Sequence, residues 1–230
     1  MPNWVFNYVD ISGNEADLRA FMDKASRPYT THHKGDWETD AEGKKTYDPD
    51  IVKESVHESV LSFMNFSSPA NLDTYFASST VKPEGYAEMS MQERIAHSMK
   101  FDSDGWYDWN VREWGTKWDA CDAEITESSD PSNGVLQYKF ETAWSPAEGA
   151  FRQMVAQHPE LDFEFSCEEE QGWGVEFASS DSELVVTKEW SIPESHADYE
   201  ERDNPDGCAC AYDDDQAEWY DDCPREKEEV

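Results

Sequence analysis

The residues best suited to metal chemistry lie near the C-terminal end of the sequence. Cys208 and Cys210 are separated by a single residue, and His196 and Cys223 belong to the same segment. Thiolate and imidazole groups are the usual ligands of structural zinc, but zinc sites space their cysteines as C-x₂₋₄-C pairs that close a tight knuckle. A C-x-C pair followed by a lone cysteine fits this geometry poorly. We therefore expect no bound metal and no cofactor, and we interpret these cysteines as reduced thiols.

A second candidate is an aromatic and basic run in the middle of the chain, Trp114-Gly115-Thr116-Lys117-Trp118. Its two tryptophans could form a platform that stacks on a ligand or holds a cation, with Lys117 as the only charge. Alternatively, Gly115 allows a tight turn while the tryptophans cap the core together with the neighbouring aromatic residues at 106, 107 and 109. We favour the core interpretation and keep the five residues as a candidate binding site.

Carboxylates are the third chemically active group. The chain has 52 acidic and 18 basic residues, a formal net charge of −34. In so acidic a chain, paired carboxylates occur everywhere and no single pair indicates acid–base catalysis, so we expect no catalytic residue. Positions 191–230 hold 15 acidic and 3 basic residues, a local net charge of −12. The acidic residues that we expect to face a partner there are Asp198, Glu200, Glu201, Asp203, Asp213, Asp214 and Asp215.

The elements that must position these residues begin with a strand and a helix. Apolar and polar positions alternate over residues 3–11, which predicts a strand with Val5 and Val9 on one face and Phe6 and Tyr8 on the other. A stripe at helical spacing follows Gly13-Asn14, and its members are Leu18, Phe21, Met22 and Ala25.

A more polar region over residues 29–107 is interpreted as an insertion. Asp48-Pro49 predicts the start of a helix that carries Val52, Val56 and Val60. Ser90 and Glu93 form a capping-box pattern, which predicts a second helix. The aromatic stretch 63–66 between them predicts a short strand or a buried turn.

The second half of the sequence predicts a hairpin, a helix and further strands. Alternating residues over 121–125 and 136–142 flank a turn at 128–134. Ser145, Pro146 and Glu148 have the types expected at N-cap, N1 and N3 of a helix. Strands are predicted over 161–167, 173–177 and 184–190.

The order of these elements is the split β-α-β order of a ferredoxin-like fold. The expected fold class is α+β, with an antiparallel sheet, a large insertion after the first helix and two extra C-terminal strands. We expect residues 1–190 to fold as one domain without the tail, because 191–230 lacks a periodic apolar face and is flexible or ordered by a partner.

Three motifs in order along the chain resemble the YubB-like family of plasmid- and phage-borne proteins. They are Met1-Pro2-Asn3-Trp4, Trp114-Gly115-Thr116-Lys117-Trp118 and Thr142-Ala143-Trp144-Ser145-Pro146. The resemblance covers most of residues 1–190, with gaps in the insertion. It implies a ferredoxin-like C-terminal part and an accessory role in a mobile element. It assigns no chemistry and no catalytic residue, and it does not extend to the tail.

Composition limits the class of protein and its location. Hydrophobic residues make up 37% and aromatic residues 13% of the chain, which favours a folded core under an acidic surface. No apolar run approaches the roughly 20 residues of a membrane helix, and residues 1–4 lack the features of a signal peptide, so we expect a cytoplasmic protein. The acidity should repel nucleic acids and membranes and attract basic proteins.

These observations favour an acidic, non-enzymatic accessory protein of a phage or plasmid. It would bind and inhibit or modulate a basic or nucleic-acid-binding host or defence protein, by mimicry of nucleic acid. The net charge equals the phosphate charge of about 17 base pairs. One alternative is an enzyme or small-ligand binder with its site near Trp114–Trp118, and another is a structural or regulatory subunit of a mobile-element assembly. The first hypothesis predicts acidic residues on one face, and the second predicts a concave pocket around the tryptophans.

Overall fold

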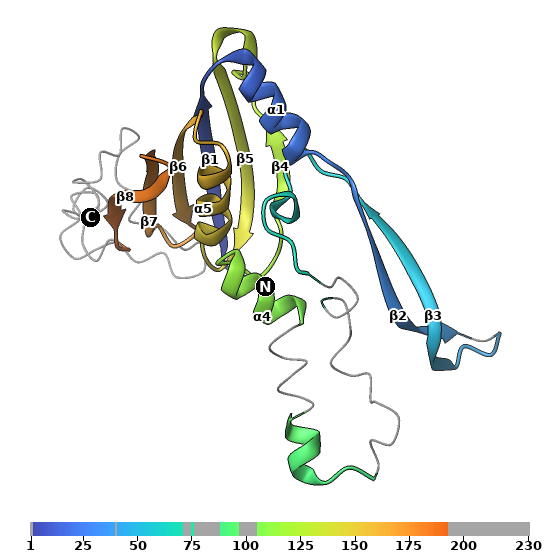
Figure 1. The fold of residues 1–230 in the computed structure, drawn as a ribbon. Coiled ribbons are helices and arrows are strands. Elements are labelled where there is room, and N and C mark those ends of the chain that lie inside the picture. The colour runs from blue at the N-terminus through green and yellow to red at the C-terminus, as the bar shows by residue number, and fades with distance from the viewer. Residues whose placement is uncertain (1, 40, 71–74, 76–87, 97–104, 193–230) are drawn as a thin grey trace, which may run out of the picture.

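The computed structural model describes residues 2–39, 41–70, 75, 88–96 and 105–192 of the chain (Figure 1). Its named elements are β1 (Trp4–Ser12), α1 (Glu15–Ala25), β2 (Tyr29–Thr39), β3 (Lys45–His57), the 3₁₀ turn η1 (Phe63–Asn65), α4 (Trp106–Glu113), β4 (Cys121–Ile125), the 3₁₀ turn η2 (Pro131–Asn133), β5 (Val135–Ala143), α5 (Glu148–Gln157), β6 (Asp162–Glu169), β7 (Gly174–Ser180) and β8 (Glu183–Trp190).

A six-stranded antiparallel sheet with strand order β4-β5-β1-β6-β7-β8 forms the body of the protein. β1 is central and pairs with β5 on one side and with β6 on the other. The units β1-α1-β4 and β5-α5-β6 are the two halves of a ferredoxin-like split β-α-β arrangement. The α+β, ferredoxin-like fold class is therefore confirmed, and β7 and β8 are the two extra C-terminal strands.

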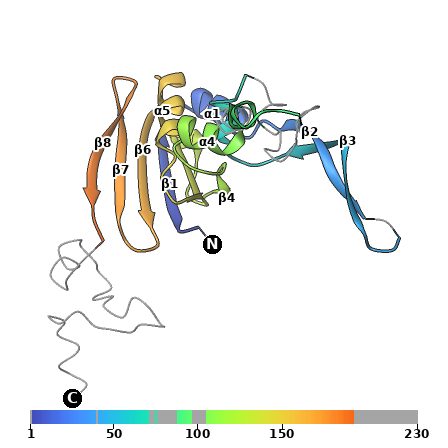
Figure 2. The same cartoon turned by 90° about the horizontal axis from the view of Figure 1, so that it is seen from below.

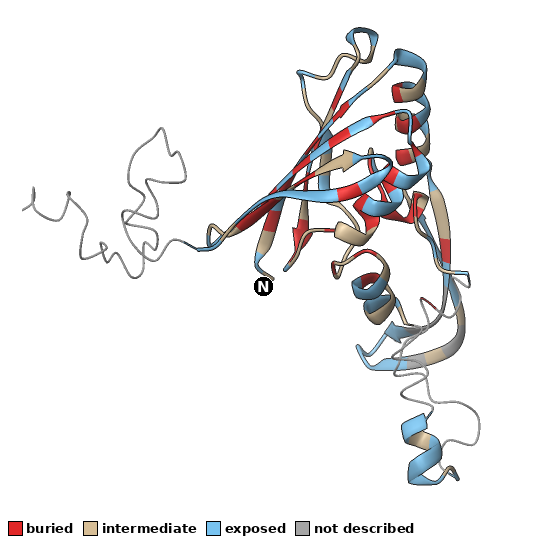
Figure 3. Cartoon of the chain, turned by 60° about the vertical axis from the view of Figure 1, so that its left-hand side comes forward, coloured by how far each residue is buried: buried red, intermediate tan, exposed pale blue. Residues whose placement is uncertain are grey.

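Alternation of buried and exposed residues gives the sheet two different faces. On β1, Val5, Val9 and Ile11 are buried, whereas Phe6 and Tyr8 between them are exposed. The buried face packs against α1 and α5, and buried positions concentrate where these helices meet the sheet (Figure 3). We call the opposite side the open sheet face. Phe6 and Tyr8 lie on it.

Helix α1 agrees with its predicted stripe. Asn14 caps the helix, because its side-chain oxygen accepts a hydrogen bond from the Asp17 backbone N–H at 3.1 Å. Leu18, Phe21 and Ala25 are buried against the sheet. The helix therefore covers β1 and its neighbours from one side.

Helix α5 begins two residues later than the capping pattern at Ser145 predicts. Its N-cap is Ala147, and Glu148 is the first helical residue. The hydroxyl of Ser145 instead donates a hydrogen bond to the backbone carbonyl of Gly115 at 2.6 Å. A tertiary contact thus uses the group that would have capped the helix.

The prediction of a helix after Asp48-Pro49 is wrong, because this segment belongs to strand β3. It pairs with β2 in a long antiparallel hairpin that projects away from the six-stranded sheet (Figures 1 and 2). Val52 and Val56 are 54% and 60% exposed, so the valines form no buried helical stripe. Their spacing of four residues fits the two-residue period of a strand as well as a helical turn.

Two other predictions in the insertion are confirmed. Residues 63–66 form a buried turn rather than a strand, with Phe63, Met64 and Phe66 in the core. The Ser90 backbone N–H donates to the Glu93 carboxylate at 2.7 Å, and the Glu93 N–H donates to the Ser90 hydroxyl at 3.3 Å. This capping box precedes a helical stretch at residues 91–96.

Candidate functional site

The predicted binding motif divides between the core and the surface. Trp114 is 1% exposed and belongs to the core. Its ring packs edge-on against Phe63 and Trp109, at centroid distances of 5.8 and 5.3 Å, and its indole N–H donates to the Ser67 carbonyl at 2.9 Å. Trp114 therefore holds α4 against the body of the protein and is not accessible to a ligand.

Gly115 and Thr116 fasten the motif to the end of β5. Gly115 has a φ of +87°, and a β-carbon there would lie 3.3 Å from the backbone nitrogen of Glu148. The buried Thr116 hydroxyl donates to the Ala143 carbonyl at 3.0 Å. Only glycine fits this turn without strain, because its backbone is both left-handed and closely approached. These two residues have a structural role.

Lys117 lies over three aromatic rings at the surface. Its ammonium group is 4.5 Å from the ring centroid of Trp144, 4.8 Å from that of Trp118 and 5.8 Å from that of Tyr107. We call these four residues the aromatic–lysine cluster. Trp118 also contacts Trp4, at a centroid distance of 5.8 Å. Trp118 is the only tryptophan of the predicted platform among these rings, and the cation over them is the chain's own lysine.

The backbone of Trp144 is strained within this cluster. Its φ is +69°, in the left-handed region that bulky residues rarely adopt, and its side chain is 47% exposed. Its backbone N–H donates to the Asn3 carbonyl at 2.9 Å, which ties it to the start of β1. Strain of this kind persists only where surrounding contacts impose it.

Asp119, just after the motif, gathers hydrogen bonds from three segments. Its carboxylate accepts from the Ser62 hydroxyl at 2.5 Å, from the Phe63 N–H at 2.6 Å and from the Ala120 N–H at 2.8 Å. The hydroxyl of Tyr29, at the base of the β2–β3 hairpin, donates at 3.4 Å. Burial raises the pKa of Asp119 against the opposite effect of these donors. We interpret the group as an anchor.

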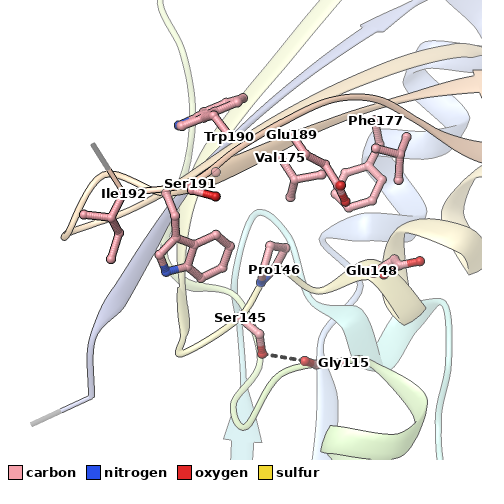
Figure 4. Close-up of a pocket in the computed structure, with 13 residues that line it drawn as sticks. Gly115, Ser145, Pro146, Glu148, Val175, Phe177, Glu189, Trp190, Ser191 and Ile192 are labelled. Atoms are coloured by element: carbon pink, nitrogen blue, oxygen red, sulfur yellow. Dashed lines mark hydrogen bonds between the residues drawn. The ribbon is translucent and has the colours of Figure 1, made fainter. Parts of the chain in front are cut away.

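A groove of about 1100 Å³ lies between the loop before α5 and strands β7 and β8 (Figure 4). Its apolar lining includes Trp173, Phe177 and Trp190, and we call it the Trp173–Trp190 groove. Gly115 is the one residue of the predicted motif that lines it. The concave pocket that the ligand-binding alternative requires is therefore beside the motif, and different tryptophans form it.

The open sheet face combines exposed aromatic side chains with carboxylates. Phe6 is 40% and Tyr8 53% exposed. In the strand register, Phe6 lies directly between Glu141 of β5 and Glu168 of β6. The other acidic residues at outward-facing positions of β1 and β6 are Asp10, Asp162 and Glu164.

A small pocket of about 290 Å³ lies on this face, over β1, β4 and β5. Besides Phe6 and Tyr8 it is lined by Asp122, Glu124, Lys139 and Glu141, and we call it the Phe6–Tyr8 pocket. β4 changes register between Cys121 and Glu124, and Asp122 in this bulge has a φ of +47°. Bulges redirect side chains, and this one brings an additional carboxylate to the pocket.

Two titratable groups record the negative potential at this site. The pKa of Glu141 is raised by burial and by the charges of Asp122 and Glu170. Burial and the carboxylates of Asp122, Asp119 and Glu141 raise the pKa of the Cys121 thiol to about 11. Burial is the larger cause of both pKa shifts, and the neighbouring carboxylates add to it in the same direction.

The remaining site predictions can be compared with only part of the chain, because the structure does not describe every residue. The seven acidic residues predicted to face a partner, between Asp198 and Asp215, and the cysteines at 208, 210 and 223 lie outside the described residues. Within the described ranges, no three His, Cys, Asp or Glu side chains are grouped as a metal site requires. No described helix is long and apolar enough to span a membrane.

Sequence reasoning missed the residues of the open sheet face as a site. The alternation of β1 places Phe6 and Tyr8 opposite the buried positions, and this was the only signal available. The carboxylates around them come from β4, β5 and β6, and only the sheet register brings them together.

Among the comparisons with known proteins, the match to a family model supports the fold. A search of curated proteins finds no match. The crystal structure of protein api92 from Yersinia pseudotuberculosis resembles this one, with 9% sequence identity, a TM-score of 0.45, and 84% of this chain and 99% of that chain covered. Residues 113–208 match the family model described as the ferredoxin-like domain in Api92-like protein. Over these residues, which are less than half of the chain, the protein is therefore similar to the ferredoxin-like domain of Api92-like proteins.

Proposed function

We propose that this is a non-enzymatic binding protein whose acidic surface takes a basic, nucleic-acid-binding protein as its partner. It inhibits or modulates that partner by occupying the groove in which nucleic acid normally lies. In this proposal it acts in the cytoplasm, as an accessory protein of a phage or plasmid related to the YubB-like family. The partner is then a host or defence protein.

The observation that carries the proposal is the grouping of carboxylates on the open sheet face. Glu141 and Glu168 flank Phe6 across the sheet, and Asp10 and Glu164 continue the acidic surface along β1 and β6. A regular sheet holds these charges at fixed spacings, as a duplex holds its phosphates. Charges of one sign on a rigid surface steer a partner of opposite sign and raise its association rate.

The experiment is a competition on a nucleic-acid column. Basic proteins from a bacterial lysate are bound to immobilised DNA, and the purified chain is passed over the column at about 50 mM and about 200 mM salt. We expect it to elute a specific DNA-binding protein at low salt and to lose affinity tenfold or more at the higher salt, because many ion pairs are screened together. A ternary complex of the eluted protein, this chain and DNA would contradict mimicry.

A second candidate function is suggested by the Trp173–Trp190 groove. A volume of about 1100 Å³ with aromatic walls is large enough for a small-molecule ligand. Its two carboxylates are Glu148 and Glu189, and Glu148 already pairs with Arg152. An apolar ligand identified by mass spectrometry of the purified protein, and lost in Trp173→Ala, would favour this function over the first.

A further inference from the structure

We propose that the Phe6–Tyr8 pocket on the open sheet face is a docking site for arginine side chains of a basic partner segment. The inference rests on the proposed function and makes it more specific, because it names both the contact surface and the side chain that the surface selects.

Exposed aromatic rings on a flat sheet are suited to a planar cation. Phe6 and Tyr8 lie two residues apart on β1, so their side chains stand next to each other on the same face. Both are well exposed although the helix-facing side of the same strand is fully buried. A guanidinium group stacks on such rings and keeps its N–H donors free at its edge.

Carboxylates lie beside Phe6, within reach of the N–H groups at the edge of a stacked guanidinium. Residues directly opposite in an antiparallel pair have β-carbons about 4.5–5.5 Å apart, and Glu141 and Glu168 are opposite Phe6 on its two sides. Asp122 adds a third carboxylate at the rim of the pocket. A guanidinium over Phe6 can therefore reach an acidic acceptor on either side, and carboxylates accept from arginine in bidentate geometry.

Lys139, the lysine in the lining of the pocket, does not neutralise the carboxylates beside Phe6. Lys139 forms an ion pair with Glu124 across β4 and β5. Glu141 and Asp122 make no ion pair with any residue that the structure describes. Burial and the charges of Asp122 and Glu170 raise the pKa of Glu141, and an incoming cation would offset the repulsion between these carboxylates.

The test compares arginine and lysine oligomers of equal length by titration calorimetry at about 50 mM salt. The two probes carry the same charge, so a difference between them reports stacking and bidentate pairing rather than net charge. We expect wild type to bind the arginine oligomer several-fold more tightly. The double variant Phe6→Ala/Tyr8→Ala, which keeps every charge, should bind it about five- to thirtyfold more weakly and lose the preference.

Two single variants serve as controls. Trp37→Ala removes an exposed aromatic residue of the β2–β3 hairpin and should bind as wild type does. Glu141→Gln should weaken binding of both oligomers. If Phe6→Ala/Tyr8→Ala, shown to be folded by circular dichroism, binds the arginine oligomer as wild type does, the docking site is refuted while the acidic-surface function stands. If wild type binds neither oligomer, the proposed function fails as well.

Discussion

Replacing the two tryptophans of the central motif one at a time should have very different consequences for stability. Trp114 is 1% exposed, contacts two aromatic rings and donates a hydrogen bond to Ser67. Truncation of a buried tryptophan to alanine costs about 3–5 kcal/mol. A chain of this size loses about 2–4 °C in melting temperature per kcal/mol, so Trp114→Ala should melt roughly 6–20 °C lower.

Trp118 has a smaller contribution to stability, because it is only partly buried and its ring contacts Trp4 and Lys117. An aromatic pair and a surface cation–π contact each contribute about 1 kcal/mol. Trp118→Ala should therefore lower the free energy of unfolding by about 2 kcal/mol and the melting temperature by roughly 4–8 °C.

Urea titrations of the full-length variants, followed by tryptophan fluorescence and far-UV circular dichroism, measure both changes on one scale. Binding of the arginine oligomer should be unaffected in Trp118→Ala, since this residue is not part of the Phe6–Tyr8 pocket. The structural interpretation of the motif would be refuted if Trp114→Ala were as stable as wild type. It would also fail if Trp118→Ala abolished binding, because the functional surface would then be the aromatic–lysine cluster.

Three further predictions concern strain, protonation and thiol reactivity. Trp144→Gly should be about 1 kcal/mol more stable than Trp144→Ala in urea titrations, because the backbone at φ +69° suits only glycine without strain, and equal stabilities would contradict this. The pKa of Asp119 is raised on folding, so the folded chain binds this proton more tightly than the unfolded chain does. The stabilisation that the bound proton provides is therefore fully present below the ordinary pKa of 3.8 and is lost as the pH rises through the folded pKa. The stability of wild type relative to Asp119→Asn should therefore increase as the pH falls from about 7 to about 4, and a decrease would refute the assignment. Cys121, with a pKa of about 11, should be only about 0.1% thiolate at pH 8, so peptide mapping should show much slower iodoacetamide labelling than in the urea-unfolded chain, whereas equal rates would contradict it.

The sequence predicts the sheet and its helices well where one physical signal acts alone. In β1, strict alternation sets both the strand and the two faces, and the exposed positions of Phe6 and Tyr8 follow from it. In α1, the apolar stripe and the Asn14 cap agree with each other. Consistency between local pattern and tertiary environment makes such segments predictable.

Prediction fails where two signals coincide or where a distant residue intervenes. Val52 and Val56 are four residues apart, which satisfies both helical and strand periods, and the pairing of β3 with β2 decides between them. Ser145 has the sequence context of a helix cap, but its hydroxyl bonds to Gly115 in a loop that precedes β4. Propensity is a weak prior that such tertiary contacts override.

The residues of the open sheet face are even harder to predict from the sequence. Glu141 and Glu168 have no distinguishing feature among 52 acidic residues of the sequence. Their importance comes from lying opposite Phe6 from two different strands, which is a property of the sheet order β5-β1-β6. No local pattern encodes that arrangement.

The most direct test of a basic partner docking on the open sheet face is a map of backbone amide shifts. The ¹⁵N-labelled chain would be titrated with the arginine oligomer, and the largest changes would be assigned to residues. We expect them in β1 around Phe6 and Tyr8 and at the facing positions of β5 and β6, including Glu141. Changes that centre on Trp173 and Trp190 of the groove, with β1 unaffected, would contradict the account.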